Sequence, residues 1–517
     1  MSTSPSGASS PHEPERLLFR RQFLLGTADI EGFPTWNRRT IAASYRLCAH
    51  PDLSMTHVDR GCQSMTLLGY MLDPDDPTAT DAKIVEGLSR DWKTTADLPR
   101  LTSRLGGRWA IVAHDGARTV LIHDAAGLRQ AYYYTSTAAG RPSLICASQP
   151  GLIAETCHLS PDPNALAYIK SRGEDDGDVY WMPGDTSPYE NVRALLPNHL
   201  LSLEEGKAVR YGPIGHARTV PSAEALREVV ATLGGLLESA RLRQPLALAM
   251  TAGWDSRLML ALCREVARDV YCYTLTYPTS SNARDVEIPA RLLGKLGLTH
   301  HVLRYPEVVD ESFKAIARRS NSAVHGAYCA DAQAVYEQYP SGRLCITGDV
   351  AEVVKAHCRL RRTPAKAITA ADLASVCKVG SHPFALAAFD SWLSGVAGYE
   401  HMDVLDLFCW EQIAGRWHAQ IRAEFDIAQE SFAPLNCRSL LLTMLAVEEG
   451  YRAGPRFALL REMIELLWRD LLLVPINPRE RLRWRRAAVS ALRRLHVYQW
   501  ISPETKSLAK RALSGWG

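Results

Sequence analysis

Short apolar runs separated by turn residues dominate the first half of the chain. Each run is four to six residues long and is rich in Val, Ile, Leu or aromatic residues, and dipeptides such as Asp115-Gly116 and Ala139-Gly140 punctuate the series. This spacing is typical of antiparallel strands joined by hairpins, so it predicts stacked antiparallel sheets. The expected strands cover residues 23–26, 109–114, 119–123, 131–135, 143–148, 200–203 and 208–211.

The pattern changes near residue 223, where buried runs begin to alternate with amphipathic segments. Strands that alternate with helices at this spacing form βαβ units, which predict a parallel sheet. Beyond residue 364 the periodicity is mainly helical. The expected strands cover residues 245–250, 270–276, 300–303 and 343–347, and the expected helices cover residues 223–241, 256–268 and 286–296.

These patterns divide the chain into two folded regions. We expect an α+β region with an antiparallel β-sandwich at residues 16–211 and an α/β region with a helical end at residues 223–517. Pro and Gly mark residues 212–222 as the linker between them. Residues 1–15 are rich in Ser and Pro without an apolar core, which predicts a disordered tail and not a secretory signal.

Composition limits the classes of protein that fit. The chain has 517 residues, with 59 Lys and Arg against 56 Asp and Glu, so its net charge of +3 excludes a global basic field for nucleic acid. No apolar run is long enough for a membrane-spanning helix. The 12 cysteines are scattered without a Cys-x-x-Cys pair, which favours reduced thiols in a cytoplasmic protein over disulfides or structural zinc.

The most informative segment is Thr251-Ala252-Gly253-Trp254-Asp255-Ser256, which connects an apolar strand to a helix. Ligands of α/β sheets bind at the carboxyl ends of strands, where a helix amino terminus offers free N–H groups to a phosphate. The small residues would let the backbone approach a phosphate closely, and the carboxylate would suit a Mg²⁺ that bridges phosphates. The alternative is a capped helix that follows a tight turn.

This segment resembles the Ser-Gly-Gly-x-Asp-Ser pyrophosphate loop of the ATP-pyrophosphatase superfamily. Further segments resemble, in order, motifs of one member of that superfamily, the asparagine synthetase family. One of them, residues 347–352, resembles the second loop of that family, Ser-Gly-x-Gly-x-Asp. The resemblance covers roughly residues 20–480, and its other segments are residues 105–110, 123–128, 132–134, 147–148, 189–203, 285–301 and 430–438.

The resemblance implies a fold and a set of roles. It implies an Ntn-hydrolase-like sandwich followed by an adenine nucleotide α-hydrolase-like synthetase region that binds ATP and Mg²⁺. Asp255 and Glu352 would be the metal ligands, and Asp349 would accept a proton from an attacking amine. The residues that would bind ATP or pyrophosphate are Leu248, Met250, Thr251, Ala252, Gly253, Trp254, Asp255, Ser256, Leu275, Thr347 and Gly348.

Other catalytic positions are less well defined by the resemblance. Glu430 is a candidate partner for Asp349, with Glu411 and Glu424 as alternatives. A late family lysine that steadies the acyl-adenylate has no clear match, and Arg479 is its stand-in. Lys355 is another candidate on the phosphate side, with a surface lysine as the alternative.

A working glutaminase region of this family uses an amino-terminal Cys. No cysteine occurs before Cys48, so we expect no glutamine hydrolysis. In this respect the chain resembles β-lactam synthetases and lasso-peptide cyclases, which take their amine from the substrate.

The last residues of the chain are strongly basic. Residues 477–517 carry ten Lys or Arg against two Glu, a balance that could attract an acidic partner. A solvated basic helix face is the alternative, and no nucleic acid partner is expected.

The functional expectation is an ATP- and Mg²⁺-dependent ligase of specialised biosynthesis. It would adenylate a carboxylate on a small molecule or peptide and join it to an amine, with release of pyrophosphate and AMP. A lasso-type peptide macrocyclase, a tRNA-modifying enzyme of the same superfamily and a nucleotide-binding pseudoenzyme remain as alternatives.

Overall fold

The computed structural model describes residues 16–28, 30–136, 143–172, 181–213, 221–277, 282–322, 326–359 and 367–478. The chain divides into two units, residues 1–474 and 475–517, and every helix and strand that the structure describes belongs to the first. The predicted tail, most of the predicted linker, Arg479 and nearly all of the basic end lie outside the described residues. The domain boundaries therefore stay a prediction.

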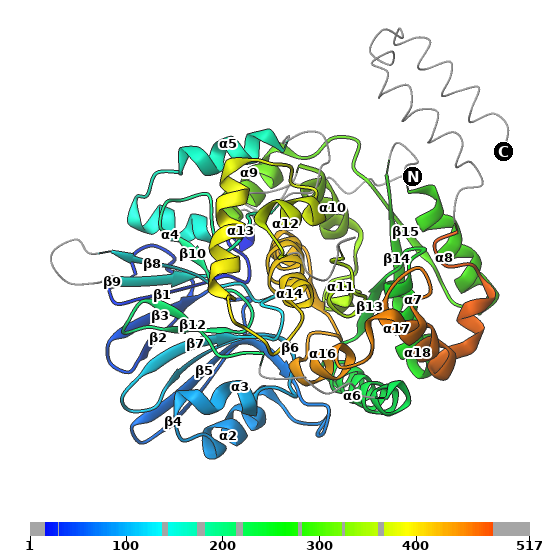
Figure 1. Ribbon diagram of the computed structural model, residues 1–517, viewed down its shortest axis with the longest axis horizontal. Helices are drawn as coiled ribbons and strands as arrows, with labels where there is room; N and C mark the ends of the chain where they lie inside the picture. Colours follow the sequence, from blue (N-terminus) through cyan, green and yellow to red (C-terminus); the bar gives the residue numbers. More distant parts are fainter. Residues whose placement is uncertain are drawn as a thin grey trace, which may run out of the picture. The chain divides into compact units, whose positions relative to one another are not determined.

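Two six-stranded antiparallel sheets form the first half, as the alternation of runs and turns predicted (Figure 1). One sheet has the order β10-β8-β9-β1-β3-β2, and the other has the order β12-β11-β7-β6-β5-β4. Their strands are β1 (Phe23–Gly26), β2 (Asn37–Ile41), β3 (Tyr45–Ala49), β4 (Met55–Arg60), β5 (Gln63–Leu72), β6 (Gly106–His114), β7 (Thr119–His123), β8 (Tyr132–Ser136), β9 (Ser143–Ala147), β10 (Arg193–Ala194), β11 (His199–Ser202) and β12 (Lys207–Arg210).

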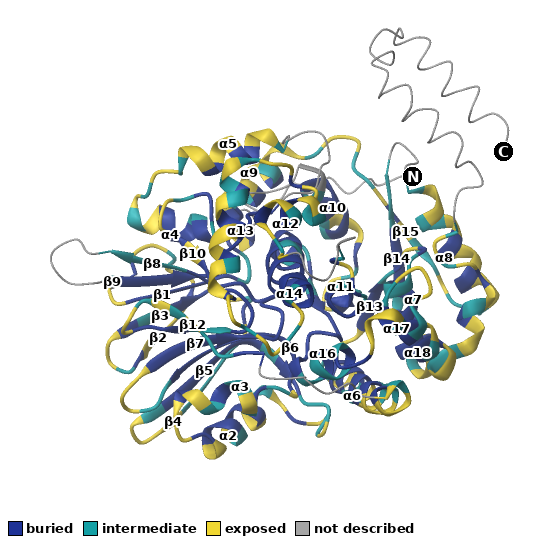
Figure 2. Cartoon of the chain, viewed as in Figure 1, coloured by how far each residue is buried: buried dark blue, intermediate teal, exposed yellow. Residues whose placement is uncertain are grey.

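Apolar side chains from both sheets meet between them. Leu25 and Leu47 from one sheet belong to the same buried cluster as Leu68, Ala110 and Leu121 from the other. Helices cover the outer faces: α2 (Asp81–Asp91) packs on β4 and β5, and α4 (Pro150–Cys157) packs on β8 and β9. The dark strands between paler helices in Figure 2 follow this layering. The short helices α3 (Leu98–Leu101) and α5 (Pro163–Ser171) complete this half.

The second half is built on a five-stranded sheet in which all neighbours are parallel. Its order is β15 (His301–Arg304), β14 (Tyr271–Thr276), β13 (Leu246–Ala249), β16 (Leu344–Ile346) and β17 (Glu430–Phe432). The chain moves from β13 to one side through β14 and β15, then returns to the other side of β13 at β16. The order of the strands therefore reverses between β13 and β16, where open α/β sheets bind their ligands.

Helices connect and cover this sheet, as predicted for βαβ units. They are α6 (Ser222–Arg243), α7 (Trp254–Leu262), α8 (Ala283–Lys295), α9 (Glu311–Ser320), α10 (Gly326–Gln338) and α11 (Ala351–Val354). The later part contains α12 (Ala370–Cys377), α13 (Pro383–Gly395), α14 (Val404–Phe408), the π-helix η4 (Cys409–His418), α15 (Ala419–Phe425), α16 (Arg438–Leu445), α17 (Glu449–Arg452) and α18 (Ala458–Trp468).

Six strands were not among those expected from the sequence: β2, β3, β4, β5 and β10 in the antiparallel sheets, and β17 in the parallel sheet. The helical periodicity beyond residue 364 did not predict β17, which is only three residues long and begins with Glu430. So short a segment shows no alternation of its own, and only its pairing with β16 makes it a strand.

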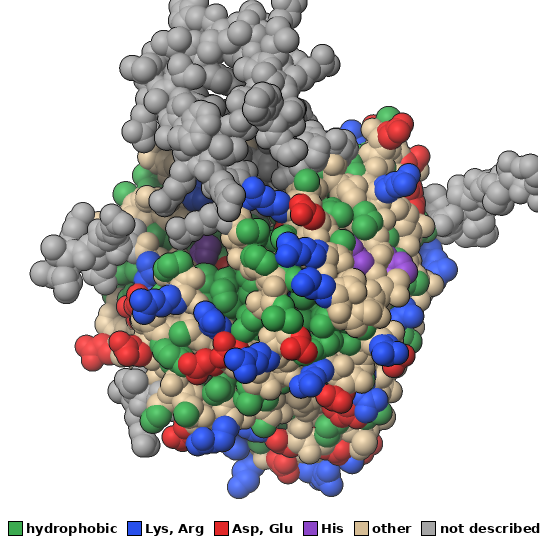
Figure 3. All heavy atoms as spheres, turned by 90° about the vertical axis from the view of Figure 1, so that its right-hand side faces the viewer, with side chains coloured by type: hydrophobic (Ala, Val, Ile, Leu, Met, Phe, Trp, Pro, Cys, Tyr) green, Lys and Arg blue, Asp and Glu red, His purple; other side chains and the backbone are tan. Residues whose placement is uncertain are grey.

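Two properties of the described residues concern the predicted partners: the apolar length of the helices and the distribution of surface charge. In the described part of the chain, no helix is long and apolar enough to cross a membrane. On the face shown in Figure 3, basic and acidic side chains are interspersed over the described surface, and no single-sign field covers it.

Candidate active site

Two loops lie side by side at the carboxyl ends of β13 and β16, where the strand order reverses. The first runs from Met250 through the start of α7 to Ser256, and the second runs from Thr347 through the start of α11 to Glu352. The register of the two strands aligns them, because Leu248 of β13 pairs with Ile346 of β16. The sequence-predicted pyrophosphate loop and the second loop are thus brought together by the sheet.

The first loop is held by its own hydroxyl groups. Ser256 Oγ accepts from the backbone N of Thr251 at 3.1 Å, and Thr251 Oγ1 accepts from the backbone N of Gly253 at 3.2 Å. Gly253 is the N-cap of α7, and no described side chain caps this helix. The first turn of α7 therefore offers a ligand N–H groups that no capping side chain takes.

An acidic side chain already contacts this loop. The backbone N of Ala252 donates to Asp285 Oδ1 at 2.9 Å, from the first turn of α8. A carboxylate oxygen on a loop N–H group is the kind of contact that a phosphate oxygen would make. The sequence pattern identified Asp285 as part of a motif but did not assign it a contact with the loop.

Gly348 lets the two loops touch. A Cβ at this position would lie 2.6 Å from Cβ of Asp255, which is closer than real side chains approach. The second loop can therefore pass the acidic residue of the first loop only with glycine here. Thr347 continues the sheet, because its backbone N donates to the carbonyl of Phe432 in β17 at 2.9 Å.

A lysine joins the acidic residues of the two loops. Lys355 Nζ donates to Asp255 Oδ2 at 2.7 Å and to Glu352 Oε1 at 3.0 Å. His418, at the end of the π-helix, lies with Nε2 3.5 Å from Glu352 Oε2, while its Nδ1 accepts from the backbone N of Val350 at 3.1 Å. We call Asp255, Glu352, Lys355 and His418 the loop cluster.

The two carboxyl groups of the loop cluster differ in pKa. Burial raises the pKa of Asp255 to about 6, and the neighbouring charge of Glu352 adds to this effect against the opposing charge of Lys355. Burial opposes ionisation of Glu352 as well, but His418 and Lys355 together lower the pKa of Glu352 to about 2. The same surroundings therefore favour the charge on Glu352 and penalise it on Asp255.

The cluster also determines how a Mg²⁺ could be held. Asp255 Oδ1 is buried and accepts no hydrogen bond from the described residues, which suits an oxygen ligand for a hard cation. Both oxygens of Glu352 already face a donor, one from Lys355 and one from His418. No group of three or more His, Cys, Asp or Glu side chains suited to a metal occurs in the part of the chain that the structure describes. The donor set fits a Mg²⁺ that takes Asp255 as ligand and most of its other ligands from phosphates and water.

Asp349 belongs to the second loop as well, but its carboxylate contacts residues outside the loop cluster. Its Oδ2 accepts from Thr347 Oγ1 at 2.8 Å and forms an ion pair with Arg422 Nε at 3.0 Å. Arg422 belongs to α15, and the sequence pattern did not identify it. The guanidinium fixes the carboxylate beside Thr347, at the carboxyl end of β16.

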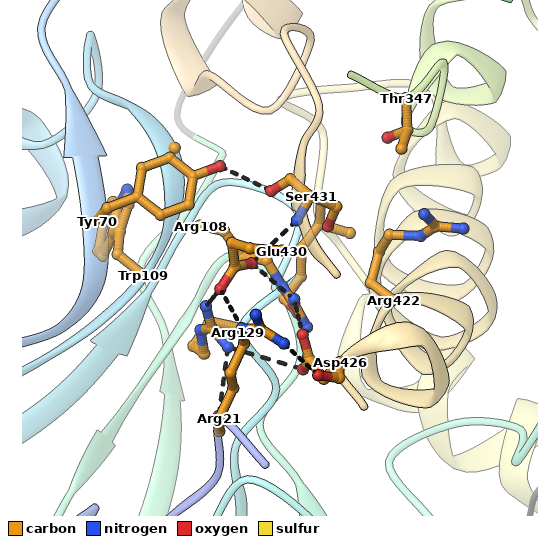
Figure 4. Close-up of polar contacts among 12 residues, drawn as sticks. Arg21, Tyr70, Arg108, Trp109, Arg129, Thr347, Arg422, Asp426, Glu430 and Ser431 are labelled. Carbon is orange, nitrogen blue, oxygen red and sulfur yellow. Dashed lines mark hydrogen bonds and ion pairs between the residues drawn. The ribbon is translucent and has the colours of Figure 1, made fainter. Parts of the chain in front are cut away.

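The structure does not bring Glu430 to these loops. Glu430 is the first residue of β17 and pairs with Leu344, the first residue of β16, so it lies at the amino end of the sheet. Its carboxylate accepts from Arg108 Nη1 at 3.0 Å and from Arg129 Nη2 at 2.9 Å, and both arginines come from the antiparallel half. Figure 4 shows it among these arginines, apart from Thr347.

The other two candidate partners for Asp349, Glu411 and Glu424, have different contacts. Glu411 is buried and accepts from Arg210 and from Trp392 Nε1, so it belongs to the contact between the two halves. Glu424, on α15 two residues from Arg422, accepts from Gln420. Neither of these contacts involves Asp349.

The remaining predicted binding residues differ in exposure. Leu248 is fully buried inside β13, and Met250 is buried while its backbone N donates to the carbonyl of Tyr273. Leu275 is half-buried near the carboxyl end of β14, and Trp254 packs its ring against Phe457 with centroids 5.8 Å apart. The polar groups of the site come from the loop backbone and the loop cluster, not from these four residues.

Comparisons with known proteins give no family. No protein-family model matches the chain, and no curated protein matches it. Among solved structures, the NH₃-dependent NAD synthetase from Campylobacter jejuni is 14% identical, with 40% of this chain and 93% of that chain covered and a TM-score of 0.20. The glutamine phosphoribosylpyrophosphate amidotransferase from B. subtilis is 10% identical, with 84% and 89% covered and a TM-score of 0.24. The glutamine-dependent NAD⁺ synthetase from Acinetobacter baumannii is 17% identical, with 49% and 55% covered and a TM-score of 0.20. Similarities this low carry no argument about activity.

Proposed function

We propose that the chain is an ATP-dependent ligase that activates a substrate carboxylate as an acyl-adenylate and joins it to an amine. The observation that carries this proposal is the contact between the two loops at the strand reversal, with Gly348 against Asp255. It places an uncapped helix amino terminus, a buried carboxylate oxygen and a lysine around one position. The resemblance of residues 251–256 and 347–352 to asparagine synthetase motifs supports the same assignment.

The first step forms the acyl-adenylate. A carboxylate oxygen of the substrate attacks the α-phosphorus of ATP, the bond between that phosphorus and the oxygen bridging to the β-phosphorus breaks, and pyrophosphate leaves. The first turn of α7 and the hydroxyl groups of Thr251 and Ser256 would bind the departing oxygens. A Mg²⁺ held through Asp255 would neutralise the charge that builds up on them.

The second step forms the amide. The amine nitrogen attacks the acyl carbon, the bond from that carbon to the AMP oxygen breaks, and the nitrogen loses a proton. Asp349 lies beside Thr347 in the second loop, and its carboxylate would accept this proton. Arg422 would fix the orientation of the Asp349 carboxylate through their ion pair.

The amine would come from the substrate and not from glutamine. Cys48, the first cysteine of the sequence, is buried in β3, and burial raises the pKa of its thiol. A buried thiol of raised pKa is a poor nucleophile. Specialised biosynthesis of a natural product or peptide fits a ligase without its own ammonia source, and a peptide macrocyclase is one form that it could take.

The test is exchange of radiolabelled pyrophosphate into ATP by the full chain, with panels of carboxylic acids and peptides. We expect acid-dependent exchange, and we expect Asp255→Asn to reduce it by about 100-fold or more, the scale on which loss of transition-state charge stabilisation acts. Asp390→Asn, which changes an exposed aspartate on α13, serves as the matched control and should exchange normally. ATP binding without exchange for any acid would instead indicate a nucleotide-binding pseudoenzyme, and transfer to tRNA would indicate the RNA-directed alternative.

A further inference from the structure

Lys355 stands between two acidic residues that come from different loops. Its ammonium is within hydrogen-bond distance of Asp255 Oδ2, at 2.7 Å, and of Glu352 Oε1, at 3.0 Å. Only 12% of the lysine side chain is exposed, so this is not a surface pair that solvent screens. The sequence pattern could not distinguish this position from a surface lysine, and its contacts now do so.

The Lys355 ammonium lies at the position where a bound triphosphate and two carboxylates would require a positive charge. Asp255 and Glu352 face each other across the site, and a bound triphosphate would add several negative charges beside them. Sites of this chemistry neutralise such charge with one or two divalent cations. Here a covalently fixed positive charge already bridges the two carboxylates. An ammonium carries three N–H donors, and the two contacts with Asp255 and Glu352 use two of them.

The contacts of the two carboxylates are unequal. Glu352 faces Lys355 through one oxygen and His418 through the other. Asp255 faces Lys355 through Oδ2 only, and its buried Oδ1 accepts no hydrogen bond from any described residue. The oxygen of the loop cluster that remains for a ligand therefore belongs to Asp255.

We propose that Lys355 serves as a built-in cation that takes the place of a second divalent metal ion between the loops, so that ATP binds with a single Mg²⁺ at Asp255 Oδ1. This inference rests on the proposed function and specifies how its site neutralises the triphosphate. The third N–H group of Lys355 donates to a phosphate oxygen. Glu352 positions Lys355 and does not bind the metal directly.

The test measures the affinity for ATP at two Mg²⁺ concentrations. Isothermal titration of the full chain at about 0.5 mM and about 20 mM Mg²⁺ gives Kd for wild type and for Lys355→Met. We expect the variant to lose about 10-fold to 100-fold in affinity at the lower concentration, because two carboxylates then face the phosphates without a counter-charge. At the higher concentration a second Mg²⁺ fills the vacated position and recovers most of the loss.

Two results would overturn the inference. One is an unchanged Kd in Lys355→Met, and the other is a loss of affinity that added Mg²⁺ does not reduce. A wild-type chain that binds no ATP at either concentration would overturn the proposed function as well, so the two failures are distinguishable.

Controls separate charge from folding. Lys314→Met removes a lysine that pairs with Glu311 on α9, and we expect it to bind ATP like wild type. Glu352→Gln/Lys355→Met has the same net charge as wild type, so its loss of affinity should be smaller than that of Lys355→Met. A thermal unfolding curve of each variant confirms folding. If Lys355→Met does not fold, the test uses Glu352→Gln/Lys355→Met and Lys355→Arg instead. The inference would then be overturned if the Kd for ATP depended equally on Mg²⁺ in the wild type and in Glu352→Gln/Lys355→Met.

Discussion

Two groups of buried charges lie at opposite ends of the parallel sheet, and they are built differently. At the amino end, Arg108 and Arg129 hold Asp426 and Glu430, and all four carboxylate oxygens accept a hydrogen bond from a guanidinium. At the carboxyl end, the loop cluster leaves Asp255 Oδ1 without a donor among the described residues. We call the first group the interface network, because its arginines and its acids come from the two halves of the chain (Figure 4).

The difference is the basis on which we assign a structural role to the interface network and propose a binding role for the loop cluster. A buried carboxylate that leaves an oxygen unpaired costs free energy, so such an oxygen is a candidate acceptor for a bound group, an ion or water. The interface network has no such unpaired acid and fixes the sheet against the sandwich, where Tyr70 Oη also donates to the carbonyl of Ser431 at 2.7 Å. The loop cluster leaves one carboxylate oxygen without a donor among the described residues, and this is the oxygen to which we assign Mg²⁺ in the proposed function.

We expect the largest effect from a substitution that breaks the interface network. Arg108→Met removes both hydrogen bonds that Arg108 donates to Asp426 and one of the two that Glu430 accepts from the arginines, in a site where Arg108 is 2% exposed. We expect the free energy of unfolding to fall by about 3–5 kcal/mol, the usual cost of removing one side of a buried ion pair. Chemical denaturation measures this loss, and Arg104→Met, which removes an exposed pair with Asp75, should cost less than about 1 kcal/mol. Similar losses for both variants would contradict the contrast.

The interface network should also make the free energy of unfolding depend on pH in the acid range. Burial alone would raise the pKa of Glu430, but Arg129, Arg108 and Arg21 lower it to about 2. The unfolded chain binds this proton near its ordinary pKa, so the stability that the network supplies is present above that value and is lost as the pH falls toward about 2. The loss amounts to about 2–3 kcal/mol. Glu430→Gln should flatten this part of the curve of unfolding free energy against pH, and an unchanged slope would count against the network.

A smaller effect tests the contact between the loops. Gly348→Ala would bring a Cβ to within 2.6 Å of Asp255 Cβ, so one loop must move. We expect about a 10-fold to 100-fold loss of pyrophosphate exchange with a stability loss of only about 1–3 kcal/mol. Gly294→Ala, in α8 with open space around it, is the control and should leave exchange unchanged. Normal exchange in Gly348→Ala would show that the close contact has no functional role.

The smallest expected effect concerns the hydroxyl groups of the first loop. Ser256→Ala removes the acceptor for the backbone N of Thr251 and a neighbour of Thr251 Oγ1. We expect the Kd for ATP to rise by about 3-fold to 10-fold, which corresponds to about one hydrogen bond. Ser394→Ala on α13, whose hydroxyl donates to the carbonyl of Asp390, should bind ATP normally. An equal effect of both changes would mean that Ser256 has no special part in the loop.

Sequence patterns predicted the sheets better than the pairing of charges. Apolar runs and turn residues suffice for β13, β16 and the loop between Met250 and Gly253, because those signals are local. The strand β17 was missed, since three residues carry no period. The contact of Glu430 with Arg108 joins residues 322 positions apart, and no local pattern reports such a pairing. Lys355 was identified as a candidate, but its place between two acids and the approach of His418 depend on the packing of the π-helix against the second loop.

The central claim is that the loops at the strand reversal hold ATP for attack at its α-phosphorus, and the identity of the nucleotide product tests it most directly. The full chain is incubated with ATP, Mg²⁺, carboxylic acids and hydroxylamine, which captures an acyl-adenylate as a hydroxamate. We predict AMP, pyrophosphate and hydroxamate in equal amounts from the wild type, and about 100-fold less or none from Asp255→Asn. Formation of ADP and phosphate instead, or equal yields from the two proteins, would contradict it.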